Sequence, residues 1–178
     1  MNRLAALLLA CILLAASAAR AEDQAASGGP DIKPLFQRGR FELLAGGGYG
    51  ETDSRSYLIL ALGGGYFFHD GLSAGLNGEA WLGSRPQIYD ASPYVRYVFL
   101  DSTWRYKPYT GVFYRRTSYA SGSSPVDSAG ARAGFVFPLS NRAYLTAGLA
   151  YERDFQAATN VTSSRDFLYP ELGLQFSF

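Results

Sequence analysis

The chain ends in Glu171-Leu-Gly-Leu-Gln-Phe-Ser-Phe178, where polar or small residues alternate with apolar ones. Strict alternation over this length puts every apolar side chain on one face of a β-strand. A strand at the end of a chain has an open edge that needs a partner. The first strand of the same chain would supply it, and a bilayer would demand it, because hydrocarbon cannot satisfy free backbone groups. The stretch therefore predicts the last strand of a closed barrel, with the last strand of a soluble sheet as the alternative.

The same alternation recurs back to Phe41, whereas helical spacing gives no comparable run. Eight alternating segments result: 41–51, 55–68, 71–83, 90–100, 105–118, 126–139, 142–155 and 166–178. The fold class that follows is all-β, an eight-stranded antiparallel up-and-down transmembrane β-barrel. Three connections are expected to be short, 69–71, 101–103 and 140–142, and four to be long, 51–55, 83–89, 118–125 and 156–165. An even strand count with this asymmetry is typical of membrane barrels.

The apolar face decides between a membrane barrel and a soluble ligand-binding barrel. The clearest segments set alanines, leucines and aromatic residues against glycines, hydroxyl residues and single charges; in 142–155 the two sets are Leu145, Ala147, Leu149 and Tyr151, and Tyr144, Thr146, Gly148 and Glu152. A soluble exterior would be densely charged, whereas glycines beside a few long side chains suit a narrow lumen. The apolar face is therefore expected outside. Segments 55–68 and 105–118 leave their two faces undecided.

Aromatic residues gather at both ends of the segments, as in the interfacial girdles of membrane barrels. Near the short connections these are Tyr66, Phe68, Phe99, Trp104, Tyr106, Phe137 and Phe178; near the long ones they are Tyr49, Tyr57, Tyr89, Tyr114, Tyr119, Tyr151, Phe155 and Tyr169. Ordinary tyrosines at strand ends would explain any one of them, but not the clustering at both ends.

Residues 1–21 are expected to be a secretory signal peptide. A cationic start at Arg3 precedes an apolar run, and Ala19-Arg20-Ala21 places small residues at a cleavage site. Residues 22–40 show no strand period and contain Gly28-Gly29-Pro30, which predicts a flexible segment before the barrel at 41–178.

The composition excludes several function classes. Cys11 is the only cysteine and lies in the expected signal peptide, so disulfides and cysteine-ligated metals are not expected in the mature chain. Arg3 and Arg20 account for two of 16 basic residues, which leaves 14 against 15 acidic ones and gives no reason to expect a nucleic-acid partner. No cofactor or metal is expected.

The terminal stretch resembles the C-terminal assembly signal of bacterial outer-membrane barrels, and Glu171, Gly173, Phe176 and Phe178 occupy its places. With the signal peptide, strand count and girdles, the mature chain resembles the small Gram-negative outer-membrane barrels of the OmpA/OmpX type. The resemblance implies an outer-membrane location, and the even strand count places both termini on the side of the short connections, in the periplasm. The resemblance also implies contact with membrane lipids and lipopolysaccharide, and assembly by periplasmic chaperones and the barrel-assembly machinery.

Charges on the polar face are expected to point into the lumen: Glu42, Glu79, Arg96, Lys107, Arg115, Arg132, Glu152, Asp154 and Glu171. Charges in a narrow lumen need partners, so a network of ion pairs is favoured over a catalytic or conducting constellation. Within it, Arg132 is expected to lie between Glu152 and Glu171. Such a lumen would be largely plugged.

No catalytic residues are expected. His69, the only histidine, stands in a short connection, whereas the lipid A palmitoyltransferase and deacylase barrels that this chain resembles in size hold a histidine near the extracellular rim. The glycine runs 46–48 and 63–65 lack the sequence of a phosphate loop and are better explained by close backbone approach. The favoured function is a non-enzymatic outer-membrane protein that supports envelope integrity or binds a surface ligand through its loops. The alternatives are a narrow, porin-like channel for small solutes, a lipid-modifying enzyme and a secreted soluble barrel.

Overall fold

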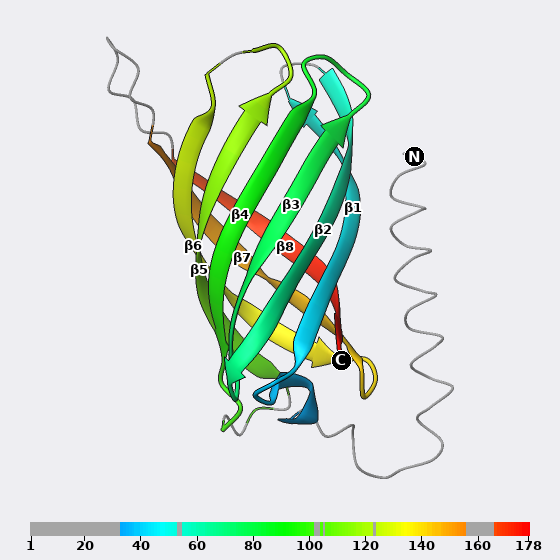
Figure 1. Ribbon diagram of the computed structural model, residues 1–178, viewed down its shortest axis with the longest axis vertical. Coiled ribbons are helices and arrows are strands. Elements are labelled where there is room, and N and C mark those ends of the chain that lie inside the picture. Colours follow the sequence, from blue (N-terminus) through cyan, green and yellow to red (C-terminus); the bar gives the residue numbers. More distant parts are fainter. Residues whose placement is uncertain (1–32, 53–54, 102–103, 105, 123, 156–165) are drawn as a thin grey trace.

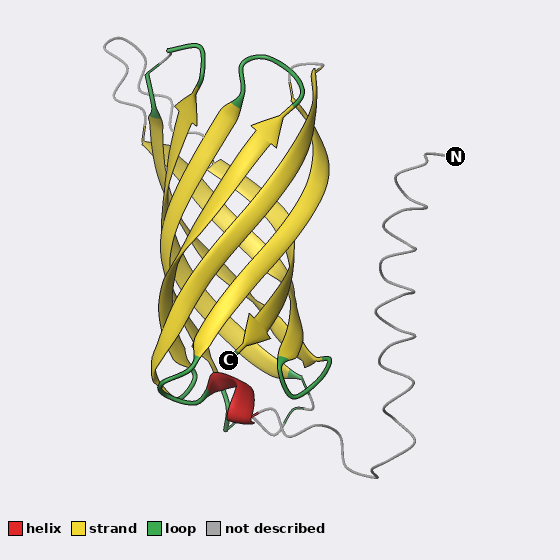
Figure 2. Ribbon diagram, turned by 45° about the vertical axis from the view of Figure 1, so that its right-hand side comes forward, coloured by secondary structure: helices red, strands yellow, loops and turns green. Residues whose placement is uncertain are grey.

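The computed structural model describes residues 33–52, 55–101, 104, 106–122, 124–155 and 166–178 and shows a closed antiparallel barrel (Figures 1 and 2). The strands, each paired with its neighbours in sequence, are β1 (Phe41–Thr52), β2 (Arg55–His69), β3 (Leu72–Leu82), β4 (Ile88–Val98), β5 (Lys107–Tyr119), β6 (Val126–Pro138), β7 (Ala143–Phe155) and β8 (Asp166–Ser177). The predicted fold class is confirmed, and the strand bounds differ by no more than about two residues, the usual uncertainty of strand ends. The expected signal peptide at 1–21 lies outside the described residues.

The alternation separates a lumen from an apolar exterior. In β7, Tyr144, Ala150 and Glu152 are buried inside, whereas Leu149 and Tyr151 are 54% and 45% exposed outside. The exterior carries a belt of exposed large apolar side chains on every strand, among them Leu43, Leu60, Leu62, Leu76, Val95, Val112, Phe135, Leu149, Leu168 and Leu172. Apolar cover of this extent does not suit a surface in water and matches the lipid-facing band of a membrane barrel.

β2 and β5, whose faces the sequence leaves undecided, also alternate between the lumen and the exterior. Tyr57 and Phe67 of β2 point inward and Leu60 points outward; in β5, Phe113 points inward and Val112 outward. Their alternation is hard to read in the sequence because both faces carry large apolar residues.

Residues 33–40 differ from the flexible segment that the sequence predicts over 22–40. A short 3₁₀ helix, η1 (Lys33–Phe36), lies across the end of the barrel where the C-terminus lies (Figure 2). Leu35 and Phe36 are fully buried there. Their cluster comprises Phe67, Val98, Tyr109, Val136 and Tyr144, and the Phe36 ring lies 4.8 Å from that of Tyr144. Four residues that fill a hole leave no periodic signal, so the sequence pattern could not show this plug.

Two hydrogen bonds fix the plug to β8 and to the turn between β2 and β3. The Ser177 hydroxyl donates to the Leu35 carbonyl at 2.7 Å, and the Gly71 amide donates to the Phe36 carbonyl at 2.8 Å. Gly39, with φ of 92°, then turns the chain into β1. The plug is therefore part of the folded barrel.

Two connections between strands differ in length from those that the sequence predicts. The connection from β4 to β5 runs over 99–106 and is longer than the expected 101–103, while β1 pairs with β2 as far as Thr52 with Arg55, which shortens the expected loop 51–55. Two tyrosines that the sequence assigns to the aromatic girdle near the long connections, Tyr57 and Tyr169, point into the lumen instead. Rings near the short connections do pack on the exterior, as Trp104 stacks on Phe135 at 5.6 Å.

The barrel closes over a short length. β1 and β8 pair only from Glu42 with Ser177 to Ala45 with Leu174, extended by reciprocal backbone hydrogen bonds between Phe41 and Phe178. β2 follows β1 along its whole length, and β7 follows β8 almost as far. In Figure 1, β1 and β8 meet near the C-terminus and separate toward the other end of the barrel.

Candidate functional site

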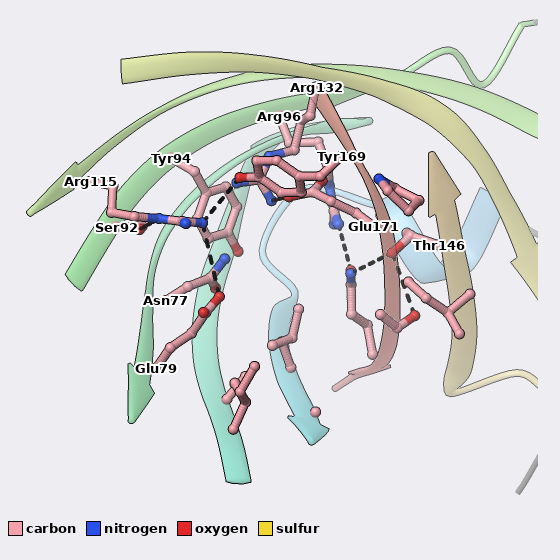
Figure 3. Close-up of a pocket in the computed structure, with 18 of the residues that line it drawn as sticks. Asn77, Glu79, Ser92, Tyr94, Arg96, Arg115, Arg132, Thr146, Tyr169 and Glu171 are labelled. Carbon is pink, nitrogen blue, oxygen red and sulfur yellow. Dashed lines mark hydrogen bonds and ion pairs between the residues drawn. The ribbon is translucent and has the colours of Figure 1, made fainter. Parts of the chain in front are cut away.

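A cavity of about 410 Å³ occupies the lumen beyond the plug (Figure 3). This volume lies within the range of small-molecule sites, roughly 300–1,000 Å³. Every strand contributes to its wall, so the whole barrel must form before the cavity exists.

Glu42 is the centre of a buried polar layer next to the plug. It is 2% exposed, and its carboxylate pairs with the Arg96 guanidinium. It also accepts hydrogen bonds from the hydroxyls of Tyr94 at 2.7 Å, Tyr144 at 2.5 Å and Ser73 at 3.2 Å. A carboxylate with this many donors has replaced the hydration it lost on burial.

Arg96 carries the layer across the lumen. Its guanidinium donates to the side-chain oxygen of Gln175, and the Gln175 amide donates to Thr146 at 3.1 Å. Gly65 and Gly75 make room for the layer, because a Cβ on either would lie 2.5–2.6 Å from the Tyr94 hydroxyl. The sequence places Tyr144 on the polar face, but the charge pattern does not show that the tyrosines and Gln175 are partners of Glu42 and Arg96; the paired glycines on neighbouring strands are the signal in the sequence.

A second network, around Arg115, lies farther from the plug. Arg115 pairs with Glu152 at 3.3 Å and approaches Glu79 at 4.0 Å. Glu152 also accepts hydrogen bonds from Tyr169 at 2.7 Å and from Ser128 at 2.5 Å. Figure 3 shows Arg115 between Glu79 and Tyr169.

Arg132 belongs to a third, looser group. Its guanidinium lies 3.6 Å from Glu171 and 4.4 Å from the centre of the Phe113 ring. The expected position of Arg132 between Glu152 and Glu171 is therefore corrected, because Glu152 pairs with Arg115 instead. Barrel strands are tilted, so residues at similar places in neighbouring segments need not lie at the same height.

The seven charges named as a lumen network thus form three groups: Glu42 with Arg96, Arg115 with Glu79 and Glu152, and Arg132 with Glu171. Lys107 and Asp154, the other inward charges expected, lie near strand ends and are partly exposed.

The lumen is less polar than the sequence predicts. Leu44, Ile59, Ala61 and Trp81 point into the cavity from β1, β2 and β3. The wall from β4 to β8 carries hydroxyls, arginines and Glu171, together with Pro170 and Leu172 of β8. The cavity consequently has an apolar patch, bordered by Glu79 and Asn77 of β3, and a mostly polar remainder.

His69 lies in the turn between β2 and β3 at the plugged end, exposed, with its ring nitrogen 3.2 Å from the Asp70 carbonyl. It is remote from the cavity lining. The two glycine runs lie on the adjacent strands β1 and β2. In β8, Glu171 and Gly173 line the cavity while Phe176 and Phe178 are exposed outside.

Within the described part of the chain, no helix is long and apolar enough to cross a bilayer. The same residues contain no group of three histidine, cysteine or acidic side chains placed to hold a metal ion.

The closed eight-stranded sheet, the apolar exterior and the charged lumen define a small transmembrane β-barrel. Solved structures with this fold include the N-terminal β-barrel domain of Pseudomonas aeruginosa OprF, with a TM-score of 0.54 and 17% identity over 79% of this chain and 98% of that one. Neisserial surface protein A (NspA) matches with a TM-score of 0.50 and 17% identity over 78% and 94%. No protein-family model and no curated protein sequence matches the chain. The resemblance to small outer-membrane barrels is confirmed at the level of the fold.

Proposed function

We propose that this protein is an integral outer-membrane barrel, sealed toward the periplasm, that supports envelope integrity or presents its loops for surface contacts. The apolar exterior, the assembly-signal residues of β8 and the likeness to outer-membrane folds support this location. In this proposal both termini and the plug face the periplasm, lipopolysaccharide surrounds the outer half, and chaperones and the barrel-assembly machinery insert the chain.

The double seal at the plugged end supports a barrel that does not conduct. An ion would first meet a layer in which Leu35, Phe36, Phe67, Val98, Val136 and Tyr144 are all 0% exposed. It would then meet Glu42 and Arg96, which are 2% and 5% exposed and bonded to each other. Crossing both layers requires losing hydration in the first and breaking a buried ion pair in the second.

Recordings in planar bilayers test this proposal. The mature protein should give no discrete current steps. A variant lacking residues 22–38 and carrying Arg96→Ser loses both seals and should conduct, whereas deletion of residues 22–31 leaves the plug in place and should not. Discrete steps from the unaltered protein would contradict the proposal and favour a channel for small solutes.

The proposal does not include catalysis. The only histidine lies at the sealed end, and the carboxylates of the cavity are engaged with arginines. Mass spectrometry of lipid A from cells with and without the protein checks this point, and a new acylated or deacylated species would contradict it.

A further inference from the structure

The edge between β1 and β8 is open over most of its length. Beyond Ala45 and Leu174, residues 46–52 pair only with β2 and residues 166–173 only with β7, among the residues that the structure describes. Pro170 lies in this part of β8, and proline, which has no amide hydrogen, suits a strand edge. The barrel wall therefore has a lateral gap, bounded by β1 and β8, in the half away from the plug.

The lumen cavity extends to this gap. Five consecutive residues of β8, Tyr169 to Gly173, line it, together with Leu44 and Gly46 of β1. Successive side chains of a strand point to opposite faces, and β1 to β4 accordingly contribute only every second residue to the lining, whereas β8 contributes consecutive ones. Lining by consecutive residues indicates that the cavity reaches around the edge of β8, where Leu168 and Leu172 face outward.

The apolar patch and the mostly polar remainder of the cavity suit the two ends of an amphiphile. Leu44, Ile59, Ala61 and Trp81 form an apolar wall next to the β1 edge. An alkyl chain that enters from the bilayer exchanges one apolar surrounding for another, so contact with this wall costs it little. The mostly polar remainder of the lining offers hydrogen bonds to a head group.

The charges of the cavity select a neutral head group. Arg96, Arg115 and Arg132 already have the carboxylates of Glu42, Glu152 and Glu171 as partners. An added carboxylate would find no arginine without a carboxylate partner among the lining residues, and an added ammonium would have to compete with Arg115 for Glu79, 4.0 Å away; either charge would also have to be desolvated. A hydroxyl, ester or amide can donate or accept a hydrogen bond without disturbing these pairs.

We propose that the cavity binds a neutral single-chain amphiphile, which enters from the bilayer through the gap between β1 and β8. Its alkyl chain lies against Leu44, Ile59, Ala61 and Trp81, and its head group meets the polar lining near Arg132 and Glu171. The gap faces the outer leaflet if the barrel has the orientation given under the proposed function, and this part of the proposal rests on that function. The binding site itself does not depend on the orientation.

Tryptophan fluorescence tests the proposal directly, because the chain contains only Trp81, in the cavity wall, and Trp104, which is 59% exposed on the exterior. The mature protein carrying Trp104→Phe is reconstituted in phosphatidylcholine vesicles with a mono-acylglycerol brominated on its chain. Bromine quenches only rings that it contacts. Saturable quenching of Trp81 is expected, at a level set by the mole fraction in the bilayer and not by the total aqueous concentration.

Two controls separate the site from general lipid contact. Brominated phosphatidylcholine, with two chains, should leave Trp81 nearly unquenched. In the Trp81→Phe protein, brominated phosphatidylcholine should quench Trp104 without saturation. Equal quenching of Trp81 by both lipids, or no saturation by the mono-acylglycerol, would overturn the proposal. Unbrominated mono-acylglycerol should compete, and equally strong competition by a fatty-acid carboxylate would overturn the assignment of a neutral head group.

Variants that fill the cavity test whether the amphiphile lies against the apolar wall, and a variant on the exterior is their matched control. Ala61→Phe and Gly46→Val add bulk to the apolar wall; a Cβ on Gly46 lies 3.5 Å from that of Ala61, which is ordinary contact. Either change should raise the half-saturating mole fraction about tenfold, the effect of about 1.4 kcal/mol. Ala147→Phe on the exterior of β7 should leave it unchanged. Folding of each variant is checked by its heat-modifiable gel mobility, and folded fillers that still bind would overturn the placement. Current recordings are independent of this assay, so failure of the binding site leaves the sealed barrel standing, and the converse also holds.

Discussion

Replacing Arg96 by alanine should destabilise the barrel more than any other single removal of a lumen charge. Arg96 is 5% exposed and holds Glu42, Gln175 and Tyr144 in one layer. Removing it leaves the Glu42 carboxylate, 2% exposed, with hydroxyl donors but no counter-charge. Breaking a buried pair in this way costs about 3–5 kcal/mol. Each 1.36 kcal/mol is tenfold, so the unfolding equilibrium constant should rise by a factor of at least about 100.

Urea titration of the protein in lipid vesicles, followed by gel mobility and tryptophan emission, measures this change. Arg116→Ala is the matched control, because Arg116 is an arginine with a carboxylate partner, Asp127 at 3.7 Å, but its side chain is 56% exposed. An exposed pair contributes about 0–1 kcal/mol, so this control should change little. Equal effects of the two alanine variants would refute the reasoning.

A double-mutant cycle sharpens the test. Glu42→Gln removes the other charge of the pair, and the double variant should lose less than the sum of the two single losses, by up to about 3 kcal/mol. Strict additivity would mean that Arg96 and Glu42 stabilise the barrel separately, which contradicts a single shared layer.

Three further outcomes are expected. Phe36→Ala should cost about 3–5 kcal/mol in the same urea titration, because it opens a hole among fully buried side chains, and a loss below about 1 kcal/mol would contradict the plug. Deleting Phe178 should reduce the folded, heat-modifiable protein in outer membranes, and an unchanged yield would remove its role in assembly. A cysteine at Ser124 should react with a membrane-impermeant thiol reagent on whole cells while one at Asp70 should not, and the reverse pattern would invert the orientation.

Part of the structure of this protein can be predicted from the sequence alone. Period-two alternation is a local property, because neighbouring side chains of a strand must point to opposite faces. The strands, their order and the lipid-facing side of β3, β4, β6 and β7 could therefore be predicted from the residue pattern, as could the inward direction of Glu42 and Arg96. The C-terminal alternation likewise predicted a final strand that pairs with the first.

Only the tertiary structure shows which side chains pair with one another in the lumen. Glu152 binds Arg115 and not Arg132 because strand tilt sets the relative heights of side chains, and no local pattern encodes tilt. The apolar wall was hidden because β2 is apolar on both faces, while Leu44 of β1 and Trp81 of β3 share their inward faces with Glu42 and Glu79. Leu35 and Phe36 close the barrel because a complementary hole exists there, and such a hole arises only after eight strands have closed around it.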